Sequence, residues 1–101
     1  MENLLQPQDI PKNLIDDVYK KIGENVKKIR EEKGITQLEL AIMIGFRSVG
    51  FISQAETYRN KQHFNIAHLT KIAYVLKVNI KDFFDGIDEI IKKENTKINH
   101  F

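Results

Sequence analysis

The sequence contains no cysteine, which excludes disulfide bonds and thiolate metal sites. No apolar run approaches the roughly 20 residues that a membrane span requires. Residues 1–7 lack the charged start and apolar core of a secretory signal peptide. Internal repeats and low-complexity segments are missing as well. These absences favour a cytoplasmic protein without membrane contact, and a chain of 101 residues is long enough for one domain with one core.

Charge of one sign is also scarce. The 16 Lys and Arg residues nearly balance the 14 Asp and Glu residues, which gives a net charge of +2 and a sequence pI near 8.8. Such a mild excess permits nucleic-acid binding without arguing for it. Basic side chains would therefore have to gather on one face for the protein to bind nucleic acid.

Patterns typical of catalysis or metal binding do not occur. The histidines His63, His68 and His100 do not place two imidazoles on one helix face near a carboxylate, so we expect no metal site. There is no Ser-His-Asp order, glycine-rich phosphate loop or carboxylate pair in an apolar setting. We therefore expect no catalytic residues, no cofactor and no enzymatic activity.

Apolar residues recur at helical spacing through most of the chain. The first stripe comprises Leu14, Val18, Ile22, Val26 and Ile29. It ends at Lys33-Gly34, a cation followed by a residue that commonly ends helices. Gly23 interrupts the stripe and leaves two readings open, one long helix or two short ones.

Polar caps mark the expected starts of further helices. Thr36 and Glu39 match a capping box, in which each side chain satisfies a backbone amide near the other residue. The second helix is expected to end at Gly45. Ser48, Asn65 and Asn79 are the expected N-caps of a third, a fourth and a short fifth helix, the last one ended by Gly86. Residues 58–64 are expected to form a polar, basic loop, and no strand pattern competes, so the sequence predicts an all-α fold.

The most informative unit is a pair of short helices separated by a tight turn. The first helix is expected at residues 36–45, and the second starts at residue 48. Ala41 is small where the second helix must let the third cross closely, and Ile52 and Ala55 are expected to face the core. The opposite side of the third helix stays free. Its residues are Val49, Gly50, Ser53 and Gln54. A helix with short polar side chains can enter a DNA major groove, which is about 12 Å wide.

These residues resemble the Cro/C1-type helix-turn-helix family, the lambda repressor-like regulators also called the XRE family. The resemblance rests on residues 22–37, Leu40-Ala41, Ile44-Gly45, residues 52–56, Leu69, residues 71–73 and Phe83-Phe84. It implies a five-helix DNA-binding domain at residues 22–86. Residues 1–21 would then be an arm and helical extension, and residues 87–101 a tail with a short C-terminal helix. The turn at residues 46–48 and the loop at residues 57–64 are longer than the family pattern.

The resemblance also implies roles for individual residues. The base-reading set is Ser48, Val49, Gly50, Ser53 and Gln54, and the phosphate-contacting set is Gln37, Arg47, Arg59, Asn60 and Lys61. Arg30 and Glu56 match a partly buried ion pair that ties the first helix to the third. The expected dimer interface consists of Phe84, Ile87, Ile90 and Ile91, because the fifth helix of this family commonly faces the partner. The alternative is that the apolar residues on either side of the domain, within 14–18 and 87–91, extend the core of one chain.

The expected function is sequence-specific binding of double-stranded DNA by a transcriptional regulator, most simply a repressor. Two copies would bind a pseudo-palindromic operator with half-sites about one helical turn apart. A phage or plasmid repressor, a restriction-modification controller and an antitoxin would all fit. The alternative is a protein-interaction module with the same fold, whose third helix or C-terminal stripe docks a protein such as a toxin.

Overall fold

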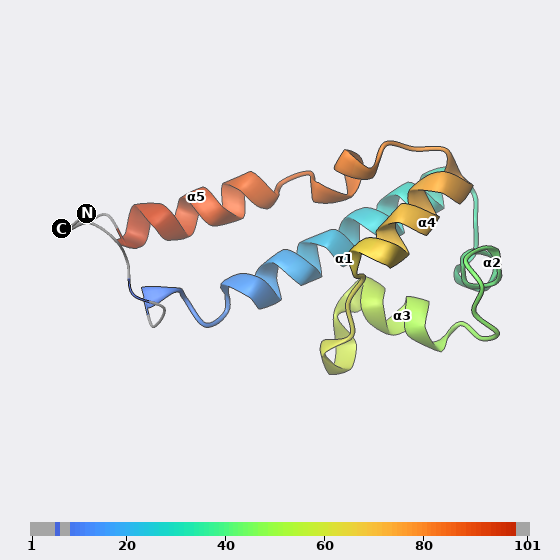
Figure 1. The fold of residues 1–101 in the computed structure, drawn as a ribbon, viewed down its shortest axis with the longest axis horizontal. Helices are drawn as coiled ribbons and strands as arrows, with labels where there is room; N and C mark the ends of the chain where they lie inside the picture. Colours follow the sequence, from blue (N-terminus) through green and yellow to red (C-terminus); the bar gives the residue numbers. More distant parts are fainter. Residues whose placement is uncertain (1–5, 7–8, 99–101) are drawn as a thin grey trace.

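The computed structural model describes Gln6 and residues 9–98, and every regular element in this part of the chain is helical (Figure 1). The α-helices are α1 (Leu14–Glu32), α2 (Gln37–Met43), α3 (Gly50–Thr57), α4 (Ile66–Leu76) and α5 (Ile87–Ile98). Two short 3-10 helices, η2 (Arg59–Lys61) and η3 (Ile80–Phe84), lie between them. The predicted all-α class is therefore confirmed.

Helix α1 runs without a break through Gly23, so the reading with one long helix is correct. The expected boundary between residues 21 and 22 lies inside this helix. Asn25 near its middle is buried, and its amide donates hydrogen bonds to the backbone oxygens of Phe83 and Asp85, at 2.9 and 2.8 Å. Because one continuous helix spans residues 14–32, the helical extension and the start of the central segment are a single element.

Two of the predicted N-caps have the expected geometry. Thr36 Oγ1 accepts from the Glu39 amide at 3.0 Å, and Glu39 Oε1 accepts from the Thr36 amide at 2.8 Å. Asn65 caps α4 in the same reciprocal way, with the His68 ring in place of a carboxylate. Gly34 and Gly45 follow the ends of α1 and α2 with φ of +71° and +98°, a region in which a Cβ atom is disfavoured.

The other two predicted caps make no capping bond, although Asn79 does occupy the N-cap position before η3. Helix α3 starts at Gly50 after Val49, whose backbone is already helical, and Ser48 makes no capping bond. Asn79 precedes η3 without a side-chain bond, and η3 is a 3-10 helix rather than an α-helix. Residues 44–49 therefore form a longer connection between α2 and α3 than a tight turn.

The core lies where α1, α2, α3, α4 and η3 meet, and α5 runs antiparallel to the first half of α1 (Figure 1). Its buried apolar residues are Ile22, Val26, Leu40, Ala41, Ile44, Ile52, Ala55, Phe64, Leu69, Ile72, Leu76, Phe83 and Ile87. Within the described residues, no helix combines the length and the apolar character that a membrane span needs.

Most of the C-terminal apolar residues expected at the dimer interface pack within their own chain. Ile87 is buried, and Phe84 and Ile90 are partly buried against the same core. Ile87 therefore leaves little surface for the expected dimer interface, because α5 packs back against α1. Ile91 remains 38% exposed. For Phe84, Ile87 and Ile90 the alternative is observed, namely that the stripe extends the core of one chain.

Candidate nucleic-acid interface

A buried ion pair holds α3 against α1. Arg30 Nε and Nη2 donate to the two carboxylate oxygens of Glu56, at 2.7 and 3.0 Å, and Arg30 Nη1 donates to the backbone oxygen of Ile35 at 2.7 Å. The side chains are only 7% and 0% exposed. The hydrogen bonds with Glu56 raise the pKa of Arg30, so the guanidinium stays charged. The pair expected from the family resemblance is present, in the bidentate form that is strongest.

Gln37 joins this pair instead of facing outward. Its Nε2 donates to Glu56 Oε1 at 2.9 Å, so α2 is linked to the same carboxylate. The start of α2 also carries the Glu39 carboxylate, whose pKa is lowered by its hydrogen bonds with Thr36. A negative charge at this helix end opposes the approach of a phosphate. Both observations weaken the predicted phosphate contact of Gln37 and give it a structural role that the sequence did not suggest.

At Gly23 the backbones of α1 and α3 approach closely. A Cβ atom built on it would lie 2.4 Å from the backbone oxygen of Ala55 and 2.8 Å from that of Glu56. Only glycine allows this contact between backbones. The inner side of α3 is therefore positioned by Gly23 and by the Arg30–Glu56 pair.

The opposite side of α3 faces outward. Val49 and Gly50 are exposed, and Ser53 and Gln54 are half-buried. The nearest neighbour of a Cβ built on Gly50 would be Ser48 Oγ at 3.9 Å, so the space beside this first helical residue is open. The predicted base-reading residues thus gather on one side of α3 and the turn before it, where a large ligand has access.

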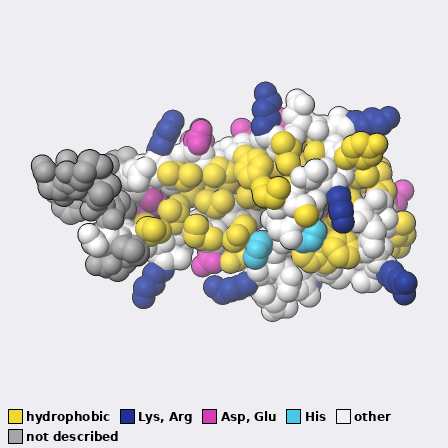
Figure 2. Space-filling view, in the orientation of Figure 1, with side chains coloured by type: hydrophobic (Ala, Val, Ile, Leu, Met, Phe, Trp, Pro, Cys, Tyr) yellow, Lys and Arg dark blue, Asp and Glu magenta, His cyan; other side chains and the backbone are white. Residues whose placement is uncertain are grey.

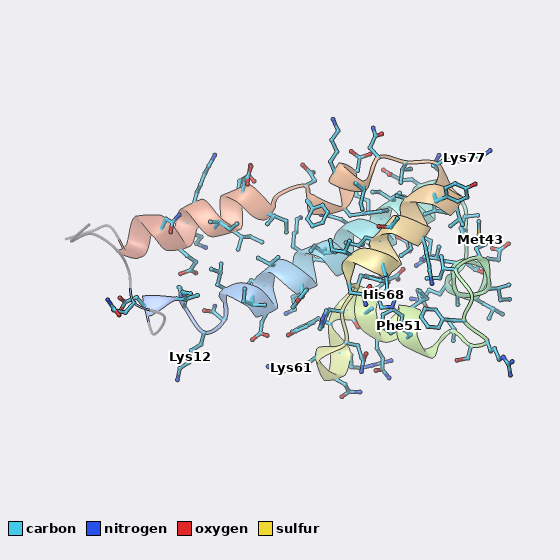
Figure 3. All side chains as sticks on the ribbon, viewed as in Figure 1. Lys12, Met43, Phe51, Lys61, His68 and Lys77 are labelled. Carbon is cyan, nitrogen blue, oxygen red and sulfur yellow. The ribbon has the colours of Figure 1, made fainter. Side chains whose placement is uncertain are left out.

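Aromatic side chains brace the connection before α3. The ring centroid of Phe51 lies 5.1 Å from that of Phe46, 5.6 Å from that of Phe64 and 4.5 Å from that of His68. Phe51 and His68 lie side by side in Figure 3. Phe51 is therefore packed inward against the core, and aromatic contacts of this kind hold the start of α3 against α4.

His68 makes this region sensitive to pH. Its Nδ1 accepts from the Asn65 amide at 3.0 Å, which requires an unprotonated nitrogen. Burial lowers the pKa of His68 below 6.5, and the positive charges of Lys71 and His63 act in the same direction. As the pH falls below about 6.5, the unfolded chain therefore takes up a proton before the folded chain does.

We expect the stability that depends on neutral His68 to be complete above pH 6.5 and to be lost as the pH falls through the lowered pKa. The melting temperature of the parent should therefore drop between about pH 7 and pH 5 by more than that of His68→Gln, which cannot titrate there. Thermal melts of both proteins across this range measure the difference. Parallel curves would contradict the prediction.

The loop after α3 carries the predicted phosphate contacts Arg59, Asn60 and Lys61, and all three are exposed. Arg59 Nη2 donates to Ser53 Oγ on α3 at 3.1 Å. Lys61 Nζ lies 3.6 Å from Asp16 Oδ1 on α1. Arg47, before α3, is also exposed. These basic side chains therefore lie on the segments that precede and follow α3.

Sequence reasoning missed the residues of α1 that contact this loop. The Tyr58 hydroxyl donates to Asp16 Oδ1 at 2.5 Å, and the Tyr19 ring stacks on His63 with centroids 3.8 Å apart. Asp16 and Tyr58 are 42 positions apart, and neither belongs to a recognisable motif. No local signal could have found this contact.

Positive charge does not gather in one patch on the face drawn in Figure 2, where Lys and Arg side chains spread around the outline. A band of hydrophobic side chains runs along the middle of that face. Among the described residues, no group of three or more His, Asp or Glu side chains could hold a metal ion. On this face, a nucleic-acid interface would lack a broad basic surface.

Comparison of the chain with protein-family models and with curated proteins gives no match. The likeness to the Cro/C1-type family thus rests on the residues quoted above, and membership stays a prediction.

Proposed function

We propose that this protein is a sequence-specific DNA-binding regulator with a lambda repressor-like helix-turn-helix, in which α3 is the recognition helix. The observation that carries the proposal is the contrast between the two sides of α3. One side is held by the buried Arg30–Glu56 pair and by the contact at Gly23. The other side presents Gly50, Ser53 and Gln54 at the surface.

A firmly held recognition helix suits base reading, because specificity requires a fixed register on the duplex. Gln54 is the residue with the most specific chemistry, since its amide can pair with both N6 and N7 of adenine. Arg47 and Arg59 would contact phosphates on either side of the groove. Val49, exposed just before α3, could contact a thymine methyl group.

A homodimer is part of the proposal, because one small domain reads few base pairs. After Phe84, Ile87 and Ile90 have packed within the chain, Ile15 of α1 and Ile91 of α5 remain 53% and 38% exposed. The hydrophobic band in Figure 2 supports an association through α1 and α5. In this arrangement α5 would still face the partner through Ile91, one of the four expected residues, joined by Ile15, which was not among them.

Selection from a pool of random duplexes tests the proposal. The purified chain should enrich a motif with two inverted half-sites about one helical turn apart. Its binding to the enriched duplex should weaken steeply as salt rises, because phosphate contacts release counterions. A pool that stays unenriched would contradict sequence-specific binding, and a single unpaired half-site would contradict the dimer.

Gln54→Ala should weaken binding to the enriched duplex by roughly 5- to 150-fold, the equivalent of one bidentate base contact. Binding to random duplexes should barely change, since the phosphate contacts remain. Fluorescence anisotropy with both duplexes measures this selectivity. Gln62→Ala, which changes an exposed glutamine beyond η2, serves as the control and should leave the affinities for both duplexes unchanged. Equal operator affinity for parent and Gln54→Ala would remove Gln54 from the reading side.

A protein-interaction module, such as an antitoxin, is the second candidate. One observation favours it, a groove of about 480 Å³ between α2 and α4. Ile42, Met43 and Tyr74 line this groove and are exposed; Met43 and the outer side of α2 are visible in Figure 3. Exposed apolar clusters of this kind mark protein contacts. If the pool enriches no duplex, and if any residual binding to duplexes does not depend on salt, this candidate is favoured.

A further inference from the structure

Three residues of the loop after α3 have left-handed backbone conformations although none is glycine. They are Tyr58, Asn60 and Lys61, with φ of 57°, 55° and 60°. A Cβ atom disfavours this region, so such a run persists only where surrounding contacts hold it in place. The η2 loop, residues 58–63, therefore needs stabilising contacts from residues elsewhere in the chain.

The support comes from the first two turns of α1. Asp16 Oδ1 accepts from the Tyr58 hydroxyl at 2.5 Å and lies 3.6 Å from Lys61 Nζ. One turn later, the Tyr19 ring stacks on His63 with planes at 20°. Residues three apart share a helix face, so Asp16 and Tyr19 contact the two ends of the same loop.

We infer that the first two turns of α1 position the η2 loop for contact with nucleic-acid phosphate, and that Asp16 is the positioning residue. The inference rests on the proposed function. Arg59 extends the connection to α3, because its guanidinium donates to Ser53 Oγ at 3.1 Å. A loop that is already ordered presents its cations without losing further conformational entropy when it binds.

The hydrogen bond to Tyr58 outweighs the charge contact with Lys61. It is the shorter of the two, and the Lys61 side chain is 77% exposed, where ion pairs contribute little. Asp16→Asn keeps a hydrogen-bond acceptor without the charge, whereas Asp16→Ala removes both. Asp17→Ala is the matched control, because it removes a carboxylate one position along the helix and leaves both loop contacts in place.

The affinity test uses a fluorescein-labelled random duplex of about 20 base pairs, titrated at several salt concentrations. Asp16→Ala should bind about tenfold more weakly than Asp17→Ala, with a salt slope flatter by about one unit. Asp16→Asn should stay within about twofold of the parent. Equal affinity and slope for Asp16→Ala and Asp17→Ala would overturn the inference. Circular dichroism establishes that each variant is folded.

Two measurements without DNA report the contact itself. Trypsin should cleave after Arg59 and Lys61 faster in Asp16→Ala than in Asp17→Ala. The Asp16 hydrogen bond raises the pKa of Tyr58 to about 12, so in Asp16→Ala one tyrosine should titrate closer to 10 by absorbance. If both readouts are unchanged, the contact is absent and the inference fails even if the protein binds DNA. If the parent binds no duplex, the proposed function and the positioning role both fail, while these readouts still show whether Asp16 holds the loop.

Discussion

Gly23→Ala is expected to lower the free energy of unfolding by about 2 kcal/mol or more. An added Cβ would meet the Ala55 and Glu56 backbone oxygens at 2.4 and 2.8 Å, and neither can move without shifting α3. Overpacking of a core contact costs about 1–3 kcal/mol, sometimes more, and here the obstacle is backbone. The helix propensity of alanine recovers only about 1 kcal/mol. Denaturant unfolding measures the loss, and DNA affinity should fall with it.

Gly50→Ala is the matched control, because it makes the same change in an adjacent element. A Cβ there has open space, with Ser48 Oγ at 3.9 Å as its nearest neighbour. Stability should be unchanged or rise by less than about 1 kcal/mol. If Gly23→Ala is as stable as Gly50→Ala, then α1 and α3 do not approach as closely as described.

Removing one partner of the Arg30–Glu56 pair is expected to cost about 3–5 kcal/mol, because the remaining charge is buried without its partner. The side chains are 7% and 0% exposed, so water cannot replace the lost contact. Replacing both, with Arg30→Met and Glu56→Leu, should recover part of the loss, since no unpaired charge remains. A double-mutant cycle by denaturant unfolding measures the coupling energy, which should exceed about 1 kcal/mol.

Lys21 and Glu24 provide the comparison. They form a looser pair, 4.0 Å apart, with side chains 37% and 58% exposed. Exposed pairs of this spacing contribute less than about 1 kcal/mol. Similar coupling energies for the two pairs would show that burial does not strengthen the Arg30–Glu56 contact.

Helix boundaries were predictable where their causes lie within a few residues. The Thr36–Glu39 box acts over one turn, and so does the Asn65 cap. The predicted cap Ser48 failed because the backbone at Val49 is already helical when the chain enters α3. Asn79 stands at the N-cap of η3 with an extended backbone, but its side chain makes no capping bond. Local rules thus locate a helix start only when the backbone leading into it agrees.

The candidate site was only partly predictable. The resemblance to a known family predicted the Arg30–Glu56 pair and the roles of individual residues on α3. Helical spacing alone predicted only which side of α3 faces outward. Gln37 was expected at a phosphate, and the structure turns it to Glu56. The contact of Asp16 with Tyr58 joins residues 42 positions apart, and no pattern in a single sequence records such a meeting.

By itself the sequence determined the all-helical class, most helix ends and the side of α3 that stays polar, because apolar spacing and capping act over one or two turns. Only the tertiary structure decided that Gly23 lies inside one continuous helix, that Ile87 is buried in its own chain, and that α1 supports the η2 loop. Each of these depends on two surfaces that are far apart in sequence, and whether they meet is settled by the packing of the whole core.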